Sequence, residues 1–175
     1  MLISFATITR QSLAILLCSG AMLCAQAADM VIPAKLQAMI IKKVVSFDQA
    51  LATKTAFKVV VVYAAESELV ANELAREFGS NGISAEIVPV AGLAGKISGC
   101  DVVYLCPGTA AAKGTVDGSG KLSVSGVPAF VNNGTVSVAI GEADGKPNIL
   151  IHQGRLAQEK HEFSSKLLKL ATVMG

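Results

Sequence analysis

Charged and aromatic side chains are scarce in this chain, and their scarcity excludes a class of function. Only 16% of the 175 residues are Asp, Glu, Lys or Arg, the formal net charge is +2, and tryptophan is absent. No run of basic residues and no basic stretch interleaved with aromatic side chains occurs. A nucleic-acid-binding surface concentrates positive charge on one face or element, so nucleic acid is not expected as a partner.

Residues that could carry out catalysis are equally few. The chain contains two histidines, His152 and His161, and neither stands at a spacing typical of a catalytic triad or a zinc site. The Gly-x-Ser-x-Gly motif of a nucleophilic serine does not occur. We therefore expect a protein that is not an enzyme and binds no metal. Both histidines are expected at the surface or as helix caps.

Glycine is missing where a nucleotide-binding fold needs it. The turn after the first predicted strand reads Ala64-Ala65-Glu66-Ser67, whereas a dinucleotide site needs glycines that let the backbone approach the phosphates. The carboxylate of Glu66 would also repel a phosphate. A later Gly118-Ser119-Gly120-Lys121 run lacks the flanking residues of a P-loop. No cofactor is therefore expected.

The N-terminal segment is apolar. Residues 13–27 carry no charged side chain, Arg10 is the only basic residue before them, and Ala25-Gln26-Ala27 has the small-x-small pattern of a signal-peptide cleavage site. The run is short for a membrane span of about 20 residues, although a retained anchor is the alternative. We expect residues 1–27 to be a cleaved signal peptide and residues 28–175 to be one exported domain.

Two cysteines, Cys100 and Cys106, remain after this cleavage. An exported compartment permits a disulfide. However, six residues of strand span about 20 Å, and a disulfide needs Cα atoms within about 7 Å. If residues 100–106 form one strand, the two thiols cannot pair with each other. We expect two buried small side chains, with a redox role or an intermolecular disulfide as the alternative.

A run of four valines marks the centre of the predicted fold. Residues 57–63 read Phe-Lys-Val-Val-Val-Val-Tyr, which suits a strand buried on both faces of a parallel sheet. Helical spacing of apolar residues occurs before this strand, at residues 33–46, and directly after it, at residues 67–78. This order predicts an α/β domain.

The remaining pattern completes a mixed sheet. Asp144-Gly145 between two apolar runs predicts an antiparallel hairpin, and an amphipathic helix is expected from Phe163, with Leu167, Leu170 and Met174 on one face. The predicted fold is a three-layer α/β domain with a mostly parallel central sheet, a C-terminal β-hairpin and a closing helix. Further strands are expected at residues 83–90, 101–106, 122–124, 135–140 and 148–152, and short helical turns at 92–98, 110–113 and 128–132.

This fold predicts where a ligand would bind. In open α/β sheets, ligands bind beyond the carboxyl ends of the strands, where the strand order reverses. Those ends correspond here to residues 64–67 and 107–110. The candidate ligand crevice therefore comprises Glu66, Ser67, Pro107, Gly108 and Thr109. An ordinary pair of crossover turns is the alternative.

Several segments resemble one known family. Residues 163–171 read Phe-Ser-Ser-Lys-Leu-Leu-Lys-Leu-Ala, residues 99–105 read Gly-Cys-Asp-Val-Val-Tyr-Leu, and residues 126–136 and 146–152 lead into and form the predicted hairpin. Together they are similar to the YfiR family, also called DUF4154, over residues 34–173. Only one of the two cysteines stands at a family-like position, so no disulfide pairing is carried over.

The resemblance implies a periplasmic α/β protein without known catalysis. The family's name-giving member restrains a membrane diguanylate cyclase from the periplasmic side. We therefore expect a non-enzymatic periplasmic regulator that contacts an inner-membrane signalling protein, such as a diguanylate cyclase in cyclic-di-GMP signalling. Exposed apolar residues of the first or last helix would form the contact. A small-molecule-binding module using the predicted crevice is the alternative, and a homodimer is compatible with either function.

Overall fold

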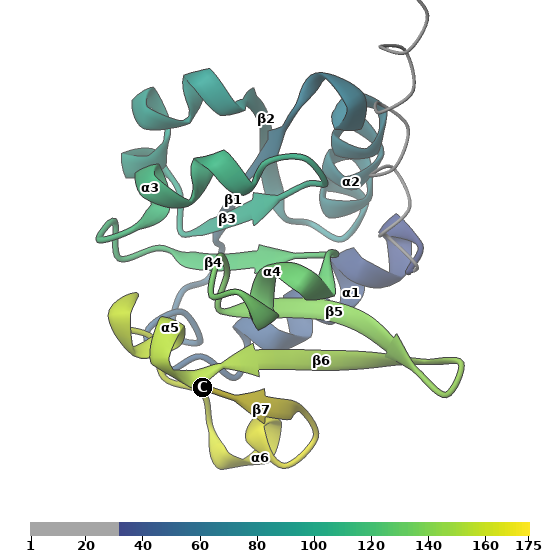
Figure 1. Ribbon diagram of the computed structural model, residues 1–175, viewed down its shortest axis with the longest axis vertical. Helices are drawn as coiled ribbons and strands as arrows, with labels where there is room; N and C mark the ends of the chain where they lie inside the picture. Colours follow the sequence, from purple (N-terminus) through teal and green to yellow (C-terminus); the bar gives the residue numbers. More distant parts are fainter. Residues whose placement is uncertain (1–31) are drawn as a thin grey trace, which may run out of the picture.

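The computed structural model describes residues 32–175, so the predicted signal peptide lies outside the described residues. Its middle layer is a seven-stranded sheet with the order β2-β1-β3-β4-β5-β6-β7 (Figure 1). The first five strands are parallel, β6 is antiparallel to β5, and β7 is parallel to β6. The strands are β1 (Lys58–Tyr63), β2 (Ser84–Pro89), β3 (Val102–Leu105), β4 (Leu122–Ser125), β5 (Val138–Ala143), β6 (Lys146–His152) and β7 (Thr172–Met174).

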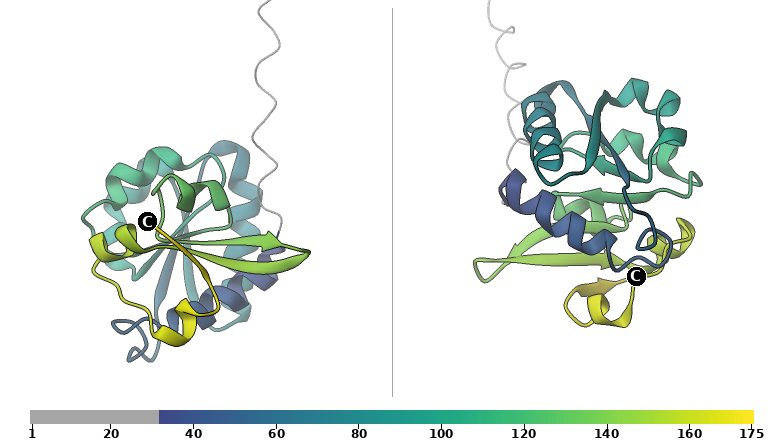
Figure 2. Two further views of the ribbon diagram at one scale, coloured as in Figure 1. Left: turned by 60° about the horizontal axis from the view of Figure 1, so that its bottom comes forward. Right: turned by 180° about the vertical axis from the view of Figure 1, so that it is seen from behind.

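Helices cover both faces of this sheet. On one face, α1 (Ala34–Val45) and α2 (Glu68–Ser80) pack over the strands, and Figure 2 shows α1 crossing the sheet obliquely. The opposite face is covered by 3-10 turns within residues 90–99 and 110–112, by α3 (Lys113–Val116) and by α4 (Pro128–Asn132). The chain closes through α5 (Gln153–Gln158), α6 (Ser165–Leu168) and β7. The predicted three-layer, mostly parallel α/β fold is confirmed.

The four valines of β1 lie at the centre of the two hydrophobic cores. Val59 and Val61 belong to the cluster beneath α1 and α2, whereas Val60 and Val62 belong to the cluster on the other face. All four side chains are fully buried. Successive residues of a strand point to opposite faces, so an unbroken apolar run is what a strand covered on both sides requires.

A buried polar contact fixes α1 on the sheet. Gln37 is fully buried, and its amide accepts a hydrogen bond from the Tyr104 hydroxyl of β3 and donates one to the Ile32 carbonyl at 2.7 Å. Gly126 passes directly over this pair, because a Cβ there would lie 2.5 Å from the Gln37 oxygen and 2.7 Å from the Tyr104 oxygen. A side chain at residue 126 would therefore displace the contact that positions α1.

The hairpin between β5 and β6 has the predicted turn. Asp144 and Gly145 have φ angles of 52° and 72°, and two successive residues with positive φ are the requirement of a type I′ turn. The pairing runs from Val138 with Ile151 to Ala143 with Lys146. The Asp-Gly signal thus fixed both the turn and the antiparallel register.

The end of the chain differs from the sequence-based expectation in its extent. The closing helix α6 is present but stops at Leu168, and residues 172–174 form β7 beside β6 instead of continuing the helix. Leu170, expected on the apolar helix face, is 73% exposed. The β-branched Thr172 and Val173 favour a strand, and β7 hydrogen-bonds the otherwise open edge of β6. The helix α5 was not predicted, because six residues are too few to show a helical period.

Candidate functional site

The strand order reverses between β1 and β3, because β1 is followed along the chain by β2 on one side and then by β3 on the other. The carboxyl ends of these two strands meet at that point. Gly108 has a φ of +80°, and a Cβ on it would lie 2.0 Å from Glu66 Oε1 and 3.2 Å from Ala64 Cβ. The structure therefore brings Glu66 and Gly108 of the candidate crevice into contact.

The other polar groups of the candidate crevice are engaged in their own turns. Ser67 Oγ accepts a hydrogen bond from the Ala64 N–H at 3.0 Å, and Thr109 Oγ1 donates one to the Cys106 carbonyl at 2.6 Å. Ser67, Thr109 and Pro107 are buried. Of the five residues, only Glu66 and Gly108 are exposed. A ligand here would meet the Glu66 carboxylate, which suits a group that donates hydrogen bonds or carries positive charge.

The two cysteines are buried free thiols on opposite faces of the sheet. Burial raises the pKa of the Cys100 thiol against the opposing effect of Lys121, and it raises the pKa of Cys106 to about 12. Because both pKa values are raised, both side chains stay protonated at neutral pH. Thiol chemistry proceeds through the thiolate, which is therefore scarce at both positions. Their surroundings match the interpretation of two buried small side chains, and a thiol redox role has no support in this geometry.

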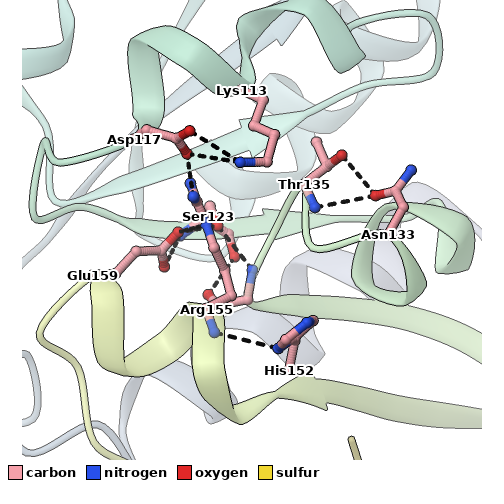
Figure 3. A network of polar contacts seen from close by, with 9 residues as sticks. Lys113, Asp117, Ser123, Asn133, Thr135, His152, Arg155 and Glu159 are labelled. Carbon is pink, nitrogen blue, oxygen red and sulfur yellow. Dashed lines mark hydrogen bonds and ion pairs between the residues drawn. The ribbon is translucent and has the colours of Figure 1, made fainter. Parts of the chain in front are cut away.

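The main polar feature of the structure was not predicted from the sequence. The cluster extends from α3 to α5 and into β4 (Figure 3). The Arg155 guanidinium, 3% exposed, donates to the Asp117 carboxylate and, at 2.9 Å, to Glu159 Oε1. Lys113 adds a hydrogen bond of 2.9 Å to Asp117. Burial opposes ionisation of Asp117, but Lys113 and Arg155 outweigh it and lower the pKa of this carboxyl.

Glu159 connects this cluster to the sheet. Its carboxylate accepts hydrogen bonds from the Ser123 hydroxyl and, at 3.0 Å, from the Ser123 N–H. Ser123 Oγ in turn accepts from the Ser137 N–H at 2.9 Å, and Ser137 Oγ donates to the Ser123 carbonyl at 2.9 Å. The β4–β5 ladder itself pairs only Val124 with Val138 and Ser125 with Ala139. The two serines therefore extend a short parallel pairing.

The two histidines have different roles. His152 caps α5, as expected, by accepting a hydrogen bond from the Arg155 N–H at 3.3 Å. His161 is 9% exposed, so the expectation of a surface or capping position is wrong for it. Its Nδ1 lies 2.9 Å from Asp48 Oδ2, while Asp48 Oδ1 accepts hydrogen bonds of 2.9 Å from the N–H groups of Ala50 and Leu51. This pair was not predicted, because its two residues are 113 positions apart in the sequence.

Next to this pair, the segment before α6 is joined to the segment after α1. Asp48 and Phe163 form an isolated antiparallel bridge, with hydrogen bonds of 2.9 Å from Gln49 N to Glu162 O and 3.0 Å from Ser164 N to Phe47 O. Within residues 32–175, no helix is both long and apolar enough to cross a membrane, and no three His, Cys, Asp or Glu side chains gather as a metal site would require.

Fold and polar cluster together define a doubly wound α/β domain whose closing segment is fastened to the sheet by buried charges. This chain belongs to the YfiR/HmsC-like family, DUF4154, whose sequence model matches residues 34–172. A search of curated proteins found no significant match.

Two solved structures share the fold. One is the crystal structure of a conserved domain protein from Vibrio cholerae O1 biovar El Tor strain N16961, with a TM-score of 0.64, 14% identity and 82% of this chain covered. The other is an ABC domain in complex with L-Trp from Streptococcus pneumoniae, with a TM-score of 0.60, 14% identity and 81% of this chain covered. The match spans 60% of the length of each of these structures.

Replacing Arg155 should reveal how strongly the buried cluster stabilises the fold. Arg155→Met leaves the Glu159 carboxylate, 1% exposed, without its cation, and breaking a buried ion pair in this way costs about 3–5 kcal/mol. Adding Glu159→Gln should recover part of the loss, since the amide keeps an acceptor for Ser123 without the charge. Urea unfolding measures these changes. Arg76→Met, at a side chain 70% exposed, is the control, and equal losses at both arginines would contradict the assignment.

The His161–Asp48 pair should make the stability depend on pH. Burial lowers the pKa of His161, but the Asp48 carboxylate, with Glu159 and the Gly120 backbone, outweighs burial and raises it above its ordinary value. A raised pKa means that the pair stabilises the folded state fully below about pH 6.5 and loses this contribution as pH rises through the folded-state value.

The measurement is urea unfolding across this pH range for the unmodified protein, His161→Gln and the matched replacement His152→Gln. The stability difference between the unmodified protein and His161→Gln should shrink as pH rises, while His152→Gln should keep the pH dependence. A difference that stays constant or grows with pH would show that His161 is not stabilised in its charged form.

Proposed function

We propose that this protein is a non-enzymatic periplasmic regulator that contacts an inner-membrane signalling protein and restrains it, with a diguanylate cyclase as the target. The observation that carries the proposal is the family match, which extends over residues 34–172 and therefore over nearly all of the described fold. The polar geometry is consistent with it, because the buried charged groups are engaged with one another in holding the closing segment in place.

We propose that the partner contacts α1 and the closing segment. Met39 of α1 is 50% exposed, and Leu170, directly after α6, is 73% exposed. The chain just after α1 lies beside the chain just before α6, because residues 47–49 pair with residues 162–164. A contiguous exposed apolar patch marks a protein–protein contact, and we propose that Met39 and Leu170 contribute to one.

Deleting the gene should raise cellular cyclic-di-GMP, because the restraint on the cyclase is lost. An added-back exported chain should lower it again, whereas a chain without residues 1–27 should not, because it stays on the wrong side of the membrane. Met39→Glu/Leu170→Glu should fail to restore the low level. Leu69→Glu, at a leucine of α2 that is 85% exposed, is the matched control and should restore it. An unchanged nucleotide level after deletion would rule out a cyclase as the target.

A second candidate function, small-molecule binding, is favoured by one observation: Glu66 and Gly108 meet where the strand order reverses. The solved ABC domain of similar fold was crystallised in complex with L-Trp, and an amino acid carries the positively charged amine that Glu66 would accept. In this alternative the crevice holds the amine of a free amino acid.

Calorimetric titration with amino acids, L-Trp included, tests this candidate. Gly108→Ala places a methyl group against Glu66 and should abolish binding. Gly118→Ala is the matched control, because Gly118 also has a positive φ, of +72°, but a Cβ there meets nothing within 4 Å. Both substitutions carry the same kind of backbone strain. Equal affinities for the two variants, or no heat with any amino acid, would reject the crevice.

A further inference from the structure

Acidic residues are absent from two segments whose ends are hydrogen-bonded to each other. Residues 33–47, which include α1, contain Lys35, Lys42 and Lys43 and no acid, and residues 163–175 contain Lys166 and Lys169 and no acid. The rest of the described chain has nine basic and twelve acidic side chains. Although the total charge is near neutral, these two segments are basic and the rest of the described chain is acidic.

The lysines of these segments lie near exposed apolar residues in the sequence, Met39 in α1 and Leu170 after α6. We call the exposed residues Lys35, Met39, Lys43, Lys166, Lys169 and Leu170 the basic–apolar surface. None of its four lysines forms an ion pair with another residue between 32 and 175. Lys43 Nζ lies 5.1 Å from the centre of the Phe47 ring. Four charges therefore remain available to a partner.

The backbone holds the two halves of this surface together. Ser164, directly before α6, donates a hydrogen bond of 3.0 Å to the Phe47 carbonyl at the end of α1. Both views of Figure 2 show α6 close to the C-terminal end of α1. The acids at this junction are Asp48, which is buried against His161, and Glu162, which is exposed beside the bridge. Among the bridged residues 47–49 and 162–164, Glu162 is therefore the one exposed carboxylate.

We propose that the basic–apolar surface binds an anionic phospholipid membrane. Lysine side chains reach lipid phosphates while their stems lie along apolar groups, and the exposed Met39 and Leu170 can enter the boundary between headgroups and acyl chains. The acidic remainder of the molecule is repelled by the same surface, which orients the domain. The inference goes beyond the proposed regulatory function, because it requires no protein partner.

Sedimentation of the exported protein with vesicles tests the proposal. Binding is expected to vesicles that contain phosphatidylglycerol and not to vesicles of phosphatidylcholine alone, and it should weaken as salt is added. Lys166→Glu/Lys169→Glu should lower the apparent affinity about tenfold or more, since each lysine near an anionic surface contributes substantially. Met39→Ser/Leu170→Ser should weaken binding while keeping its salt dependence.

The control Lys121→Glu/Lys146→Glu changes the net charge by the same amount at the start of β4 and at the hairpin, and its affinity should fall less than about threefold. Circular dichroism verifies that each variant is folded. Equal binding to neutral vesicles, equal losses in both double lysine variants, or binding to polyaspartate without binding to vesicles would each overturn the proposal. The vesicles hold no cyclase, so this result is independent of the cyclic-di-GMP measurement.

Discussion

The Glu159 carboxylate is the contact on which the second half of the fold depends. It accepts hydrogen bonds from Ser123 at the start of β4 and from the Arg155 guanidinium of α5. Ser123 also forms two hydrogen bonds with Ser137, just before β5. The ladder between β4 and β5 is only two residue pairs long. A single buried acid thus joins the short parallel junction of the sheet to the segment that closes the domain. Leaving the buried Glu159 carboxylate without a partner would destabilise the fold by more than one ordinary hydrogen bond stabilises it. The closing segment is therefore most stable where Arg155 and Ser123 both reach this carboxylate.

The same constraint determines which surfaces lie next to each other. His161 follows Glu159 by two residues and pairs with Asp48 at the end of α1. Along this path basic and acidic groups alternate, from Lys113 and Asp117 through Arg155 and Glu159 to His161 and Asp48, so each buried charge has an opposite neighbour. Because residues 162–164 are thereby held against residues 47–49, the ends of two acid-free segments that are far apart in the sequence are brought together. The buried His161–Asp48 pair thus lies next to the bridge that joins these two segments.

The sequence predicts those features that depend on neighbouring residues. Four successive valines suffice to place β1 between two cores, and Asp144-Gly145 defines the hairpin. The meeting of Glu66 and Gly108 follows from the general rule about strand ends and needs no long-range information. The charge cluster is different, because Asp117 and Arg155, or Asp48 and His161, are brought together only by the finished fold. A buried histidine looks like a surface histidine in sequence when its partner is 113 residues away. The length of α6 escaped prediction for a related reason, since the open edge of β6 decides that residues 172–174 become a strand.

The two edges of the sheet help to explain why an interaction surface would lie on the helices. At one edge, Glu86 of β2 forms ion pairs of 2.7 Å with Lys58 and with Lys96. Hydrogen bonds from these two lysines lower the pKa of Glu86 to about 2, so the edge stays charged at any physiological pH. Charged side chains on an edge strand discourage pairing with another chain. At the other edge, β7 is only three residues long and offers little ladder to extend. Both edges are thus unsuited to strand addition, whereas α1 and the segment around α6 present exposed apolar groups. The lysines beside these groups favour a negatively charged partner.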